Sequence, residues 1–233
     1  LSLTWSCRSN VVRAYRKIGW LGSFGAVAFG FSLVFLTMAL HKSPIADVMF
    51  TLAAIPILTA LIAWAALRER IEKVTWIAMI GAAMGVALMV AGHLTGGSIK
   101  GVSLSIGCAV TVSIFAVILR WGRDLNMIPM FAVGSFIAAA IAAPFSFKGP
   151  SLNGENIAIL LFWGGLVSPI YYSLFVIASR HIRAGELMLL VPLETILAVL
   201  LAWLILSEIP STNSLLGGIL VIAAVSGMGI YRI

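Results

Sequence analysis

One carboxylate in this sequence stands where a charge is costly. Glu194 lies about nine residues into the apolar run 185–206, roughly 14 Å along a helix that rises about 1.5 Å per residue. A charge near the centre of a membrane costs at least about 2.5 kcal/mol on insertion scales, so we expect Glu194 to face other helices and not lipid. Ala198 and Ala202 share its helix face, and such small residues are typical of close helix packing.

Two roles fit a carboxyl group in this position. Glu194 can bind a cationic solute or exchange a proton, which is the usual reading of an acid inside a membrane. The alternative is a structural role, in which a protonated Glu194 is held by a hydrogen bond to a neighbouring helix, for example through Tyr171 or Tyr172.

Three prolines and a hydroxyl-rich stretch form a second group of candidates. A proline inside a helix removes the hydrogen bond to the carbonyl four residues earlier, and a freed carbonyl beside hydroxyl groups can line a polar cavity. Broken helices in corresponding halves of a membrane protein point to a solute site, whereas each proline alone is also explained by a packed kink. The residues concerned are Pro56, Pro192 and four members of the stretch "SPIYYS", namely Ser168, Pro169, Tyr171 and Tyr172.

Two further acids and one glycine pair have simpler interpretations. Asp47 and Glu186 fall in the first turns of predicted helices, where a carboxylate complements the helix dipole; a gate is the alternative. Gly81 and Gly85 form a GxxxG pattern, which is typical of helix packing within one chain or between the two copies of a homodimer.

Motifs for enzyme, metal or cofactor chemistry are not found. There is no HExxH, and "AVSG" at 224–227 lacks the first glycine of an embedded serine protease motif. Cys7 and Cys108 have no CxxC or Cys/His spacing. We therefore predict no catalytic residue, metal or cofactor, and an intramembrane enzyme is a weaker alternative than a carrier or a non-transporting membrane scaffold.

The composition identifies the medium in which these residues act. Hydrophobic residues make up 61% of the 233 and charged residues 10%, whereas soluble domains have about 45–50% and about 25%. The positive charges lie between apolar runs and not on one basic face, which argues against nucleic acid as a partner. Because the runs are too long for barrel strands, they predict an all-α integral membrane protein.

Eight runs are long enough to cross a bilayer, which takes about 20 mostly apolar residues. They cover about 19–40, 46–67, 74–93, 101–122, 127–147, 156–178, 185–206 and 214–231. Positive residues collect on one side of this arrangement, which predicts that both chain ends are cytoplasmic. That side has twelve, namely Arg8, Arg13, Arg16, Lys17, Arg68, Arg70, Lys73, Arg120, Arg123, Arg180, Arg183 and Arg232, and the other side has Lys42, Lys100 and Lys148.

One phrase occurs twice, 139 positions apart. "AWAALRERIEK" begins at Ala63 and "AWLILSEIPST" at Ala202, and the same shift pairs Asp47 with Glu186. Five predicted spans separate the two copies, so they end on opposite faces. This predicts two inverted repeats of five helices, as in many secondary transporters. The first, 1–95, has only three helices, so we expect two more before it; the second, 101–233, is complete.

The repeated segments resemble the EamA-like domain of the drug/metabolite transporter superfamily. "IPILTALIAWAALRERIEKVTWIAMIGAAMGVALMV" is similar to the end of its first copy, and "GELMLLVPLETILAVLLAWLILSEIPSTNSLLGGILVIAAVSGMG" to the end of its second. Thr195 stands where the pattern often has Pro, and Ser207 where it often has Gly. The resemblance implies a ten-helix secondary carrier in a bacterial inner membrane, which exports an amino-acid-like or other small organic solute by alternating access.

Overall fold

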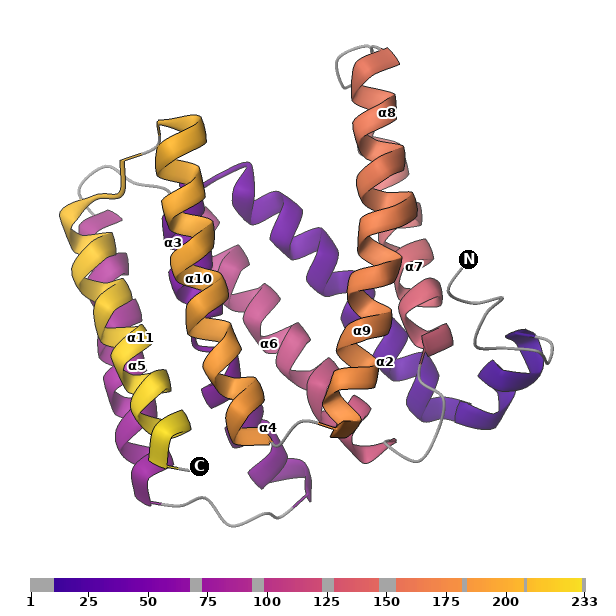
Figure 1. Ribbon diagram of the computed structural model, residues 1–233, viewed down its shortest axis with the longest axis horizontal. Coiled ribbons are helices and arrows are strands. Elements are labelled where there is room, and N and C mark those ends of the chain that lie inside the picture. The colour runs from indigo at the N-terminus through magenta and orange to yellow at the C-terminus, as the bar shows by residue number, and fades with distance from the viewer. Residues whose placement is uncertain are drawn as a thin grey trace. The chain divides into compact units, whose positions relative to one another are not determined.

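All regular structure in the described part of the chain is helical (Figure 1). The computed structural model describes residues 11–67, 73–93, 99–122, 128–146, 154–181, 184–207 and 209–231. The helices are α2 (Val11–Leu40), α3 (Ile45–Leu52), α4 (Ile55–Leu67), α5 (Lys73–His93), α6 (Ile99–Trp121), α7 (Ile128–Ser146), α8 (Gly154–Phe162), the π-helical turn η1 (Trp163–Val167), α9 (Ser168–His181), α10 (Ala184–Leu206) and α11 (Thr212–Tyr231).

Helices are found at all eight predicted apolar runs. The pair α3 and α4 occupies one span, and α8, η1 and α9 together occupy another. Within the described residues, four stretches are long and apolar enough to cross a membrane, namely Gly19–Leu40, Ile45–Ala66, Ile99–Trp121 and Ile157–Leu174; four shorter apolar helices accompany them. The spans follow from the sequence because a helix in lipid must pair its backbone groups internally while its side chains stay apolar.

Local backbone features mark where helices bend or stop. Gly19 has φ 63° and ψ −147° inside α2, a conformation that only glycine adopts without strain, and α2 kinks there. Ser207 has a positive φ of 55° directly after α10. A left-handed residue is a common helix stop and is usually glycine, so Ser207 adopts the backbone of the glycine that the related pattern often has.

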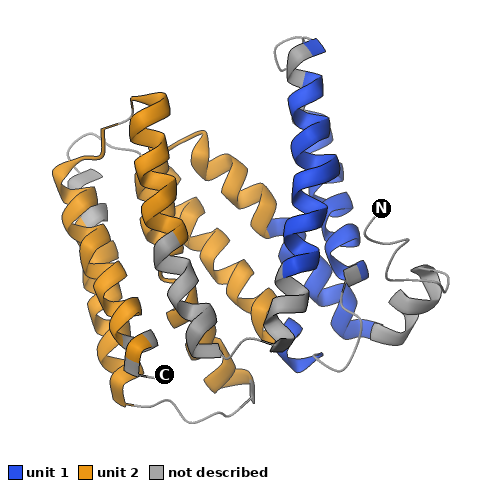
Figure 2. Cartoon of the chain, in the orientation of Figure 1, with its two compact units in different colours: residues 1–31, 118–182 blue, residues 32–117, 183–233 orange. Residues whose placement is uncertain are grey.

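The chain divides into two compact units (Figure 2). Unit 1 contains Leu1–Phe31 and Ile118–Ile182, and unit 2 contains Ser32–Val117 and Arg183–Ile233. The compact units therefore differ from the predicted sequence repeats 1–95 and 101–233, because each unit takes helices from both repeats.

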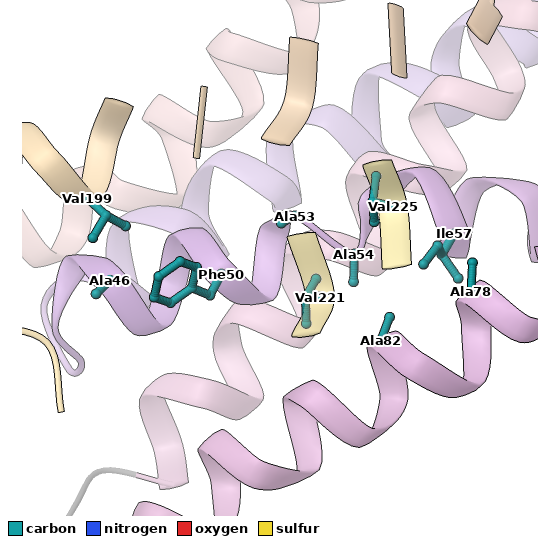
Figure 3. Packing of buried hydrophobic residues seen from close by; sticks show 10 residues of the cluster. All are labelled: Ala46, Phe50, Ala53, Ala54, Ile57, Ala78, Ala82, Val199, Val221 and Val225. Atoms are coloured by element: carbon teal, nitrogen blue, oxygen red, sulfur yellow. The ribbon is translucent and has the colours of Figure 1, made fainter. Parts of the chain in front are cut away.

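The core of unit 2 is built mainly from small side chains (Figure 3). Phe50 of α3 is its one large aromatic side chain, and it lies against Gly218 of α11. The other members are Ala46, Ala53, Ala54, Ile57, Ala78, Ala82, Val199, Val221 and Val225. Small residues let helix backbones approach closely, which is how helices associate where burial from water does not drive packing.

Helices α5 and α11 pack closely against each other in unit 2. A Cβ on Gly85 would lie 2.6 Å from the Gly217 carbonyl oxygen and 2.7 Å from a methyl group of Val221, and one on Gly81 would lie 3.2 Å from Ala224. The GxxxG pattern therefore packs within the chain, and this face is not available for the homodimer that was its alternative reading.

The same contacts show that α5 and α11 run antiparallel. Moving up α5 from Gly81 to Gly85 means moving down α11 from Ala224 to Gly217. The helix bounds also repeat with the shift seen in the sequence: 139 positions after Ile45–Leu67 lie the bounds of α10, Ala184–Leu206, and 139 after Lys73 lies Thr212, the start of α11.

Unit 1 is held by glycine contacts between α2 and α7. A Cβ on Gly30 would meet the Gly134 carbonyl oxygen at 2.8 Å, and one on Gly134 would meet the Ala26 carbonyl oxygen at 2.7 Å. Phe29 lies beside this contact with its ring 5.0 Å from that of Phe131. Both rings are buried, so the α2–α7 contact continues into a small aromatic core.

Candidate functional site

Glu194 lies on the edge of the packed face of α10. Its neighbours Thr195, Val199 and Ala202 are 4%, 9% and 5% exposed and form the stripe that packs in unit 2. Ala198 is half-buried, whereas the side chain of Glu194 is exposed. The predicted stripe of Glu194, Ala198 and Ala202 thus becomes more buried along its length, and unit 2 does not enclose the carboxyl group.

The SPIYYS stretch begins where the helix changes its hydrogen-bonding pattern. The π-helical turn Trp163–Val167 comes directly before Ser168, whose hydroxyl donates to the Trp163 carbonyl at 3.0 Å. Pro169 has no N–H to donate to the carbonyl of Gly165. The irregularity predicted at Pro169 is therefore present as a π-helical turn, and the Ser168 hydroxyl pairs with one of its carbonyl groups. Single π-helical turns inside α-helices are frequent at functional sites.

Tyr171 and Tyr172 belong to the aromatic core of unit 1. The Tyr172 ring lies 5.1 Å from Phe29, 4.9 Å from Phe131 and 5.2 Å from Tyr171. Tyr171 is 48% exposed at the edge of this cluster. Tyr172 is therefore packed among aromatic rings, and Tyr171 is the more exposed of the two.

Pro56 follows a true break in its span. Helix α3 ends at Leu52 and α4 begins at Ile55, and the turn between them is tightened by a bond from the Ile57 amide to the Ala54 carbonyl at 3.0 Å. The hydroxyl of Ser113 on α6 donates to the Ile55 carbonyl at 3.2 Å. The break predicted at Pro56 is thus present, and a polar side chain from another helix supports it.

Pro192 does not break its helix. Helix α10 runs without interruption from Ala184 to Leu206. The prediction of three broken spans is therefore wrong for this one. A membrane helix tolerates proline when the neighbouring backbone adjusts locally around the missing bond.

Asp47 is more deeply placed than its sequence position indicated. It does lie in the first turn of α3, as predicted, but it is only 1% exposed. The Ser214 hydroxyl, from the first turn of α11, donates a hydrogen bond to Asp47 Oδ1. One sequence signal could have placed Asp47 among the leading candidate residues, namely its pairing with Glu186 after 139 positions. The side chain of Glu186 lies outside the described residues.

The candidates fall into both compact units. Ser168, Pro169, Tyr171 and Tyr172 belong to unit 1. Glu194, Pro192, Pro56 and Asp47 belong to unit 2. Within unit 2, packing brings α3 against both α10 and α11, so Asp47 and Thr195 lie on helices that touch each other.

Comparison with known families identifies the class of protein. The chain matches the EamA-like transporter family over residues 2–91 and again over residues 99–230, and it belongs to that family. It is therefore an integral membrane protein of a transporter class and not an enzyme.

A comparison with solved structures adds the fold alone. A solved structure titled "Crystal structure of protein" is similar with a TM-score of 0.55 and 18% identity, covering 99% of this chain and 94% of that one. No curated protein matches the sequence.

Proposed function

We propose that this protein is a secondary carrier that moves a small organic solute across a membrane by alternating access. The observation that carries the proposal is the family match over both halves of the chain. The antiparallel packing of α5 on α11 supports it, because these helices hold equivalent places in the sequence 139 residues apart. Two inverted repeats provide two alternative packings of similar energy, which alternating access requires.

Equivalent side chains of α4 and α10 support a ten-helix carrier. Ile57 and Ile196 are the same residue 139 positions apart, yet Ile57 is 4% exposed and Ile196 is 42% exposed. In unit 2, α6 reaches the start of α4 through Ser113. In the first repeat, a helix equivalent to α6 would cover α10 in the same manner, as one of the two helices expected before α2.

Glu194 is the residue that we assign to coupling or solute binding. An exposed carboxylate on a helix of this apolarity is disfavoured against lipid, so we infer that the edge of α10 at Glu194 faces a water-accessible path. Separately from Glu194, we propose Tyr171, Ser168 and the carbonyls at the π-helical turn as candidates for solute contacts within unit 1. The solute would be amino-acid-like or another small organic molecule.

The membrane setting follows from the distribution of charge. We propose a bacterial inner membrane, both chain ends in the cytoplasm, and export as the direction of transport, with the lipid bilayer and a small solute as partners. Exposed tryptophans near helix ends support this placement in a membrane. The ring centroids of Trp64 and Trp76 lie 6.3 Å apart, and those of Trp20 and Trp121 lie 6.1 Å apart. Such rings collect where the apolar core meets the headgroups.

The test is Glu194→Gln in the full-length protein. An efflux screen that compares intracellular metabolites with and without the wild-type protein identifies the solute, and flux of that solute is then measured in vesicles. We expect Glu194→Gln to abolish or uncouple flux, because the amide keeps the size of the side chain but cannot ionise.

Two controls make the result specific. Glu194→Asp should retain part of the flux, because it keeps a carboxyl group, and membrane insertion of all variants is measured by surface labelling. Normal transport by Glu194→Gln at every pH tested would show that Glu194 is structural only.

A further inference from the structure

Two lysines that are far apart in the sequence lie together at one end of unit 2. Lys42 is in the turn before α3, Lys100 is in the first turn of α6, and both side chains are exposed. The two segments meet where Ser43 packs on Gly101: a Cβ on Gly101 would overlap the Ser43 side chain and lie 3.0 Å from the Lys42 carbonyl carbon. Because Gly101 has no side chain, Lys42 and Lys100, here called the lysine pair, start from adjacent positions on the surface.

The packing of α2 on α6 leads up to the lysine pair. The Cys108 thiol of α6 donates to the Ser32 carbonyl of α2 at 3.3 Å. A Cβ on Gly107 would lie 3.5 Å from the Phe35 ring. Moving along α6 from Cys108 toward its start therefore means moving along α2 from Ser32 toward its end, so the two helices are antiparallel. The lysine pair lies at the end that they share.

Apolar side chains border the lysine pair on both helices. At the end of α2, Met38 and Leu40 are 47% and 38% exposed, and on α6, Ile99 and Ile106 are 49% and 40% exposed. Ile106 lies two turns after Ile99 and therefore on the same face of α6. The exposed surface thus changes from ammonium groups at the helix ends to apolar side chains along the helices. Headgroups and acyl chains follow one another in the same order in a lipid monolayer.

No exposed acid lies among the described residues of α2, α3 and α6. Asp47 is the one acid on these helices, and it is only 1% exposed. It accepts the hydrogen bond of Ser214 and is enclosed where α3 meets α11. The surface around the lysine pair is therefore positive, and its charge complements an anion.

We propose that the lysine pair binds the phosphate group of an anionic phospholipid whose acyl chains lie along the exposed faces of α6 and the end of α2. Lysine ammonium groups donate strong, charge-assisted hydrogen bonds to phosphate oxygens, and basic residues between membrane helices commonly hold acidic headgroups. The apolar border favours a lipid over a soluble phosphate. The inference goes beyond the proposed transport, because it needs only the membrane setting.

The position of the lysine pair in the predicted topology also points to a use for it. The side of the membrane on which it lies has three of the fifteen counted positive residues, since lysine and arginine collect on the cytoplasmic side. Two of these three are Lys42 and Lys100. The few positive charges on this side are thus gathered at one point instead of being dispersed.

The experiment uses the whole protein in phosphatidylcholine vesicles that contain a small fraction of photoreactive phosphatidylglycerol. We expect the label on peptides that contain residues 38–43 and 99–106. Excess unlabelled phosphatidylglycerol should suppress the labelling, and inorganic phosphate in the buffer should not. Suppression by inorganic phosphate would overturn the assignment to a lipid. Equal labelling of these peptides by photoreactive phosphatidylcholine would overturn recognition of the anionic headgroup.

The two charges are tested by replacement with glutamine, which keeps a long polar side chain. Lys42→Gln and Lys100→Gln should each raise the phosphatidylglycerol concentration needed for competition about fivefold, and both together about 25-fold, as the usual contribution of a lysine at an anionic membrane surface implies. Lys73→Gln is the matched control, because this exposed lysine begins α5 at the other end of unit 2. An equal effect of Lys73→Gln, or no effect of the double variant, would overturn the site.

The spacing of the two charges is tested without removing either. Gly101→Ala should push the Lys42 segment away from α6 and weaken the labelling, although both lysines remain. Gly107→Ala is the control on the same helix, because its Cβ would make an ordinary contact with the Phe35 ring. Wild-type labelling of Gly101→Ala would contradict a site that needs the lysines side by side, and the glutamine variants decide the matter if Gly101→Ala does not fold.

Discussion

At the scale of single residues, Gly85 sets the distance between α5 and α11. The nearest obstacle to a side chain there is the backbone oxygen of Gly217, at 2.6 Å, which cannot rotate away. We expect Gly85→Ala to force the two helices apart and to destabilise the protein by about 1–3 kcal/mol, the usual cost of overpacking. Thermal unfolding in detergent measures this.

Gly227 provides the control for Gly85. It lies on α11 itself, and a Cβ there would meet nothing within 4 Å. Gly227→Ala should therefore leave the unfolding temperature unchanged or raise it, because alanine is the better helix former. If both variants unfold at the same temperature, the Gly85 contact does not hold α5 to α11.

Asp47 and Glu194, two acids of unit 2, show how position on a helix decides whether a side chain is buried. Asp47 is enclosed where two helices begin, and Glu194 is left at the edge of a packed stripe. Both lie in apolar sequence, and sequence reasoning ranked Glu194 above Asp47. The depth of Asp47 comes from Ser214, which lies 167 residues away in the chain.

At the scale of elements, α6 supports the broken span formed by α3 and α4. We expect Ser113→Ala to destabilise the protein by about 1 kcal/mol, because the Ile55 carbonyl beside the break loses its 3.2 Å partner. Hydrogen exchange of the first amides of α4 should also become faster, since the break is where that helix can open.

Thr111 is the matched control for Ser113 on the same helix. Its hydroxyl bonds only to carbonyls of its own helix, those of Gly107 and Cys108. Thr111→Ala should therefore leave exchange in α4 at the wild-type rate. Faster exchange in both variants would mean that α6 as a whole was disturbed and that the Ser113 bond has no particular role.

At the scale of the whole molecule, the arrangement of helices makes a topological prediction. Lys73 begins α5 and Asn213 lies in the first turn of α11, and these helices are antiparallel. We therefore expect single cysteines at the two positions to be labelled from opposite sides of the membrane by an impermeant reagent.

A cysteine at Lys42 is the control for that topology. Lys42 precedes α3, and the bond between Ser214 and Asp47 places the starts of α3 and α11 at the same end. Positions 42 and 213 should react from one side and position 73 from the other. Labelling of 73 and 213 from the same side would contradict the inverted arrangement and the carrier mechanism built on it.

The sequence by itself determined the eight apolar spans and the family of this protein. Both depend on local signals, namely runs of apolar residues, helix stops and a phrase repeated after 139 positions. The break beside Pro56 and the π-helical turn before Pro169 were also predictable as irregularities, because a proline lacks its N–H in any context. The continuity of α10 through Pro192 was not, since neighbouring backbone can compensate for the missing bond.

Only the tertiary structure decided which residues meet. The partner of Gly85, the burial of Asp47 and the exposure of Glu194 depend on which helices pack side by side, and the chain encodes that through contacts between residues far apart in sequence. A periodic pattern shows that a helix has a packed face. It does not show how far that face extends around the helix, because its edges are set by the shape of the neighbouring helices.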